Sequence, residues 1–175
     1  MNAVSQMILG IVGALVLVSY YVVFGHLYRS RGTSYATHDF WFGIDETFVK
    51  ILIAFQIAAV VGFLVAITMW FVQPPEGGIM GRPSILFLTL LVFLLASICW
   101  PFATYYKSPV LVVGSLLLAA IASILLLAGS VQEDKTRVPV MLGLLFFSIV
   151  TVLADGVLWN ANYIYRIIHD KTTTQ

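Results

Sequence analysis

Charged side chains are scarce in this sequence. Nine Lys and Arg and eight Asp and Glu make up 10% of the 175 residues, whereas hydrophobic residues make up 61%. A soluble domain carries roughly 25% charged residues, because its surface must be hydrated. The composition therefore excludes an ordinary soluble protein and predicts an integral membrane protein, with the lipid bilayer as its first partner.

An excess of positive charge is also missing, since the formal net charge is only +1. Proteins that bind nucleic acid neutralise phosphates with clusters of Lys and Arg. We therefore expect no nucleic-acid partner.

Cysteine is nearly absent, and the groups of residues that support catalysis are missing. The single Cys99 permits no internal disulfide and no cysteine-ligated metal. His26, His38 and His169 do not follow the spacing of metal ligands. The chain also lacks a zinc-protease helix motif, a serine nucleophile elbow and a glycine loop that could cradle phosphate. We expect no enzyme activity, no metal and no cofactor.

Long apolar runs are abundant. A helix needs about 20 mostly apolar residues to cross a hydrocarbon core of about 30 Å. Five runs meet that length, at about residues 4–27, 47–72, 84–106, 109–131 and 138–165. They predict an all-α polytopic membrane protein, a bundle of five transmembrane helices that forms a single transmembrane domain over residues 1–175.

Polar and helix-breaking residues separate these runs. Pro74 and Pro75 follow the second run, and Ser108 and Pro109 form a very short link between the third and fourth. Residues 28–46 are both charged and aromatic, which predicts a segment in the headgroup layer with Trp41 among the lipids. Asp45 is placed to cap the second helix.

The positively charged residues predict the orientation. Five spans put the termini on opposite sides, and Lys and Arg accumulate on the cytoplasmic side of membrane proteins. With the N-terminus outside and the C-terminus inside, three of these residues lie outside and six inside. The outer residues are Arg82, Lys135 and Arg137, and the inner ones are Arg29, Arg31, Lys50, Lys107, Arg166 and Lys171.

Asp155 is the acidic residue placed within the fifth run. A charge in the middle of a membrane helix costs about 2.5–3.5 kcal/mol on insertion scales, and it usually faces the protein interior. At 100° per residue, Ser148, Asp155 and Trp159 share one face of that helix. We expect Asp155 to be paired inside the bundle, with Lys50 as the preferred partner and Gln56 as the neutral alternative.

Polar and aromatic residues gather in the inner half of several spans, which predicts a candidate ligand cavity opening to the inner side. Its candidate binding residues are Asp155, Lys50, Gln56, Trp100, Trp159, Asn162 and Tyr20. For the Tyr and Trp residues alone, an ordinary aromatic belt at the membrane surface is the favoured explanation of the pattern. For Asp155, hydration near the interface or simple helix pairing is the alternative.

Two functions follow from this pattern. The preferred one is a non-catalytic subunit or scaffold of a larger membrane assembly, an oligomer formed with other membrane subunits or by self-association. The alternative is a protein that binds or translocates a small ligand or ion through the polar cavity around Asp155. The sequence identifies neither a ligand nor the membrane in which the protein resides.

Overall fold

The structure of the chain is a computed structural model, and it describes residues 1–34, 45–75, 78–131 and 138–172. All regular structure within these residues is helical. The elements are α1 (Ala3–Ser34), α2 (Glu46–Val72), α3 (Pro83–Tyr105), α4 (Pro109–Val131), α5 (Val138–Val150), the π-helical segment η3 (Thr151–Trp159) and α6 (Asn160–Thr172). The last three follow one another without a break and form one long helix.

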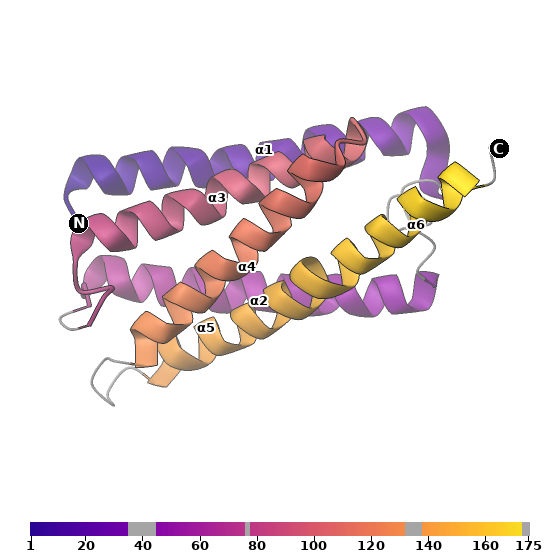
Figure 1. Cartoon of the computed structure of the whole chain (residues 1–175). Helices are drawn as coiled ribbons and strands as arrows, with labels where there is room; N and C mark the ends of the chain where they lie inside the picture. The colour runs from indigo at the N-terminus through magenta and orange to yellow at the C-terminus, as the bar shows by residue number, and fades with distance from the viewer. Residues whose placement is uncertain (35–44, 76–77, 132–137, 173–175) are drawn as a thin grey trace.

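Five helical stretches are long and apolar enough to cross a membrane, as the sequence predicts. They are Ala3–Ser30, Thr47–Val72, Pro83–Tyr105, Pro109–Val131 and Val138–His169. This result supports a multi-pass integral membrane protein. Successive helices run in opposite directions, so the N-terminus and the C-terminus lie at opposite ends of the bundle (Figure 1).

Helix α4 occupies the centre of the packing. It contacts α3, α5, η3 and α6, whereas α1 packs mainly on α3 and α2 packs mainly on α5. Within the most apolar 18-residue stretch of each helix, 44% of the residues are buried in α4 but only 17% in α1. Large apolar side chains such as Leu17 and Ile57 are exposed on α1 and α2. Lipid tails are apolar, so these faces are suited to contact with a bilayer.

The first helix is longer than the sequence analysis predicts. It continues from the expected end at Leu27 to Ser34, so the start of the predicted headgroup segment is helical. Charged residues do not by themselves end a helix, and the chain has neither proline nor glycine between Leu27 and Gly32. Residues 35–44, which include Trp41, lie outside the described residues.

Local hydrogen bonds explain several of the helix ends. The Asp45 side chain accepts hydrogen bonds from the backbone N–H groups of Thr47 and Phe48, at 2.9 and 3.3 Å, which confirms the predicted cap of α2. Between α3 and α4, Ser108 donates its backbone N–H to the Ala103 carbonyl at 2.9 Å. This tight turn requires a positive φ of 55° at Lys107.

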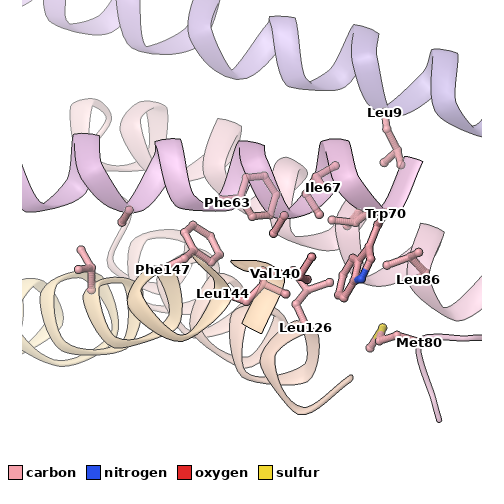
Figure 2. Packing of buried hydrophobic residues seen from close by; sticks show 14 of the residues in the cluster. Leu9, Phe63, Ile67, Trp70, Met80, Leu86, Leu126, Val140, Leu144 and Phe147 are labelled. Atoms are coloured by element: carbon pink, nitrogen blue, oxygen red, sulfur yellow. The ribbon is translucent and has the colours of Figure 1, made fainter. Parts of the chain in front are cut away.

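Aromatic rings fill the middle of the core between α2, α3 and α5. The rings of Phe63, Phe93 and Phe147 contact one another with centroid separations of 4.6 to 5.3 Å. Nearer the end of α2, Trp70 and Met80 are both almost fully buried. Figure 2 shows Met80 returning from the α2–α3 connection to lie beside Trp70. Its side chain covers the end of the core next to the α2–α3 connection.

Two glycines allow α2 and α5 to approach closely. A Cβ atom added at Gly143 would lie 2.5 Å from the Gly62 carbonyl oxygen, and one added at Gly62 would lie 3.1 Å from the Gly143 carbonyl oxygen. Small residues at such crossings let two helix backbones pack against each other within a membrane. The α2–α5 contact therefore depends on the absence of side chains at both positions.

We predict that Gly143→Ala lowers the free energy of unfolding by about 1–3 kcal/mol, because the added methyl group forces the two backbones apart. Gly114→Ala is the matched control, since a Cβ at Gly114 has no atom within 4 Å. The control is expected to be neutral or to stabilise α4 by up to about 1 kcal/mol. Unfolding in detergent micelles measures both variants. Equal stability of the two would contradict the close α2–α5 crossing.

Candidate functional site

Asp155 lies in the middle of η3, and its side chain is partly buried. A π-helix is rare, because its i to i+5 hydrogen bonds pack the backbone less well than α-helical ones, and such segments are often found at functional sites. The element continues α5 and leads into α6, so Asp155 lies well inside the fifth membrane span. The structure thus places an acidic residue and an unusual backbone at the same point.

Gln56 on α2 is the observed partner of Asp155. Its side-chain Nε2 donates a hydrogen bond to Asp155 Oδ1 at 3.1 Å. Gln56 reaches this position because it belongs to the inward stripe of α2, which also carries the buried Val49, Ala59 and Phe63. Residues at such three- and four-residue spacing share one face of a helix.

Lys50, the partner preferred from the sequence, occupies a different face of α2. It is six positions before Gln56, which corresponds to about 120° around the helix and about 9 Å along it. The residue is exposed, and Val49 beside it is buried. The neutral alternative, Gln56, is therefore the partner that the structure places against Asp155.

Tyr20, Trp100 and Trp159 come together from three helices. Trp100 Nε1 on α3 donates a 2.7 Å hydrogen bond to the Tyr20 hydroxyl on α1. The Trp100 ring meets the Trp159 ring edge-on, with centroids 4.8 Å apart. Phe24, one turn after Tyr20, stacks on the Tyr20 ring at 5.9 Å. The sequence analysis expects these rings to line a cavity, and the structure shows them packed against one another.

An electrostatic interaction joins the aromatic cluster to the acidic residue. The charge of Asp155 acts on the Tyr20 hydroxyl, and Trp100 connects Tyr20 to Trp159, which lies four residues after Asp155. Gln56, Asp155, Tyr20 and Trp100 thus form one polar network, which draws on four of the five long apolar helices. We refer to these four residues as the Asp155 network.

Asn160 is a buried polar residue that the sequence analysis does not include in the candidate site. It begins α6 and is only 5% exposed. Its Nδ2 donates to the Gly156 carbonyl at 3.1 Å, but its Oδ1 has no hydrogen-bond partner among the described residues. In an α-helix, Asn160 would lie about 140° away from Asp155.

Asn162 lies one turn before Arg166 on α6, and both are partly buried. No described contact connects Asn162 with the Asp155 network.

A second interhelical bond forms at the predicted polar face, where the Ser148 hydroxyl donates to the Ser123 carbonyl of α4 at 2.8 Å. This bond and the contact of Gly156 with Ala120 hold the fifth span against α4.

His26 lies near the C-terminal end of α1 and His169 near the C-terminal end of α6, whereas His38 lies outside the described residues. His26 and Tyr105 are joined by a 3.1 Å hydrogen bond between His26 Nε2 and the tyrosine hydroxyl. Within residues 1–34, 45–75, 78–131 and 138–172, no three His, Cys, Asp or Glu side chains group as metal ligands would. The side chains of the Asp155 network can form hydrogen bonds and carry charge.

Comparison with known proteins identifies no relative. No protein family, no curated protein and no solved structure matches the chain. The function must therefore be argued from the chain's own residues.

A double-mutant cycle tests the central hydrogen bond. We predict that Gln56→Leu and Asp155→Leu couple by about 0.6–2 kcal/mol in the free energy of unfolding, because each single variant leaves one polar group unpaired in the bundle. The double variant leaves no unpaired polar group from this pair. The control cycle combines Asp155→Leu with Gln6→Leu in place of Gln56→Leu, because Gln6 lies near the start of α1. Additive effects in the Gln56 cycle would show that the bond does not form.

Proposed function

We propose that this protein is a small multi-pass membrane protein that binds a small polar ligand or ion within the bilayer, at the Asp155 network. The observation that carries this proposal is an acidic side chain inside a membrane span that receives one described hydrogen bond, from Gln56. Acidic residues in membrane spans commonly mark ion or substrate sites, because their insertion is costly.

If Asp155 served only to pair helices, more of the hydrogen-bonding positions of its carboxylate should be filled. A carboxylate has about four lone-pair positions and no donor when it is ionised. Among the described residues, Gln56 supplies one donor to Asp155. Unsatisfied polar groups cost several kcal/mol in lipid. The excess of acceptors favours a ligand that donates hydrogen bonds or carries positive charge.

A role as a non-catalytic subunit or scaffold is the second candidate, and it is the one preferred from the sequence. Its supporting observation is the open face of α1, where Cβ atoms added at Gly10 and Gly13 would meet nothing within 4 Å. Small residues spaced along a membrane helix allow another helix to pack closely. Other membrane subunits or a second copy of the chain are the proposed partners. Neither candidate function involves catalysis.

We further propose that the N-terminus lies outside and the C-terminus inside. Exposed tyrosines support an interface at the inner ends of the helices, because Tyr prefers the headgroup layer. They are Tyr21, Tyr28, Tyr105, Tyr106 and Tyr165. The α3–α4 turn lies at the same end of the bundle as the C-terminus (Figure 1). It carries Lys107, one of the six inner cations.

Labelling of single cysteines tests this orientation. In a Cys99→Ser background, we predict that Ser108→Cys is labelled from the inner side and Ile79→Cys from the outer side. Ser108 lies in the α3–α4 turn, and the exposed Ile79 lies in the α2–α3 connection at the other end of the bundle. Impermeant maleimide applied to intact cells or to opened vesicles distinguishes the sides. The reverse pattern would invert the topology.

Thermal unfolding in a series of chloride salts tests ligand binding. We predict that Na⁺, K⁺, Li⁺ or NH₄⁺ raises the melting temperature relative to choline chloride at equal ionic strength. A ligand at 100 times its Kd contributes about 2.7 kcal/mol of stability. Asp155→Asn should abolish this rise, and Asp45→Asn, which can still cap α2, should retain it. Absence of any cation effect, together with cross-linking through Gly10→Cys, would favour the subunit function instead.

A further inference from the structure

The donors and acceptors of the Asp155 network are unequally matched. The Tyr20 hydroxyl accepts from Trp100 Nε1, so its own hydrogen remains available for donation. Among the described residues, the Asp155 carboxylate accepts one hydrogen bond, from Gln56. A carboxyl group that takes up a proton changes from an acceptor into a donor. Protonation at Asp155 therefore removes part of the mismatch without any larger ligand.

We propose that Asp155 is an exchangeable proton site, whose carboxyl group binds a proton from the inner aqueous phase and returns it there through water between Asp155 and the Tyr20 hydroxyl. This inference rests on the proposed function, and it identifies the bound ion as a proton. One O–H bond forms at the carboxylate when the proton enters, and the same bond breaks when it leaves. No oxidant, reductant or second substrate is required.

The position of Tyr20 provides a short route to the inner surface. Asp155 acts electrostatically on the Tyr20 hydroxyl, and a bridging water would connect the two groups. His26 lies six residues further along α1, about 9 Å along the helix axis, and is exposed. Its hydrogen bond to Tyr105 places two groups that can exchange protons at the inner end of α1 and α3.

Few other titratable groups lie near this site in the described part of the chain. From α1 the titratable group is Tyr20, from α3 it is the partly buried Cys99, and from α6 it is Tyr163. Helices α4 and α5 contain no titratable side chain. On α2, Gln56 is neutral and Lys50 lies on another face. A pH response of the bundle interior is therefore attributed to Asp155.

Infrared spectroscopy of the reconstituted protein tests the proposal directly, because a protonated carboxyl group has its own C=O stretching band. We expect such a band to grow and disappear as the pH is varied between about 4 and 9, a range that spans ordinary and perturbed carboxyl groups. It should shift in D₂O and be absent from Asp155→Asn. Asp45→Asn should retain it, because Asp45 lies at the exposed start of α2.

A second pair of variants tests the role of Tyr20 as a positioning residue. Tyr20→Phe keeps the ring and removes the hydroxyl. In this variant we expect the Asp155 carboxyl proton to exchange for deuterium severalfold more slowly, as followed by the shift of its C=O band. Tyr28→Phe removes an exposed hydroxyl from the same helix and should leave the exchange unchanged. Unchanged exchange in Tyr20→Phe would overturn the proposed route. If Asp155→Asn does not fold, Asp155→Glu is used, and it should move the band without removing it.

The failures of the two proposals are distinguishable. A carboxyl band of Asp155 that does not respond to pH, together with stabilisation by Na⁺ or another tested cation, would overturn the proton site and leave the ligand-binding function. No response to pH and no response to cations would overturn both. A band that titrates while no cation stabilises the protein would support the proton as the bound ion.

Discussion

Polar side chains on helices as apolar as these must find their partners within the protein, because lipid tails offer none. This constraint acts most strongly at Asp155, which meets Gln56 across the α2–η3 contact. The helices that surround it contribute the aromatic rings and the hydroxyl that complete its environment. Once Asp155 is turned inward, the faces of α2 and of the fifth span are determined, and the aliphatic residues of both helices are left for the outer surface.

Close backbone packing makes this polar contact geometrically possible. Gly62 and Gly143 let α2 and α5 approach without intervening side chains, and Gly156 lets η3 approach Ala120 of α4. The fifth span is therefore held on two sides. The π-helical segment begins eight residues after Gly143, on the same continuous helix.

Much of the fold could be predicted from the sequence, because length and hydropathy determine which segments can cross a bilayer. Span four was predicted with the same bounds as α4, and the Asp45 cap follows from the chemistry of its side chain. The extension of α1 to Ser34 was not predicted, since charge was taken as the end of the helix. The π-helix was not predicted either, because it results from tertiary packing and leaves no simple residue pattern.

The candidate site was predicted in part. Asp155 and Gln56 were singled out by their depth in apolar runs, and the structure joins them. Lys50 was preferred for its charge, although its angular offset from Gln56 on an ideal helix already indicates a different face. Asn160 was not among the candidate binding residues, and its burial becomes apparent only from the packing of the helices.

The most direct test of the Asp155 network is a solid-state NMR measurement of the protein in lipid bilayers, with ¹⁵N in glutamine side chains and ¹³C in aspartate side chains. The account predicts dipolar transfer between Gln56 Nε2 and the Asp155 carboxyl carbon, at a strength that fits the N–O separation of 3.1 Å. The signal should vanish in Gln56→Leu. A folded protein in bilayers that shows no transfer between these two groups would contradict the account.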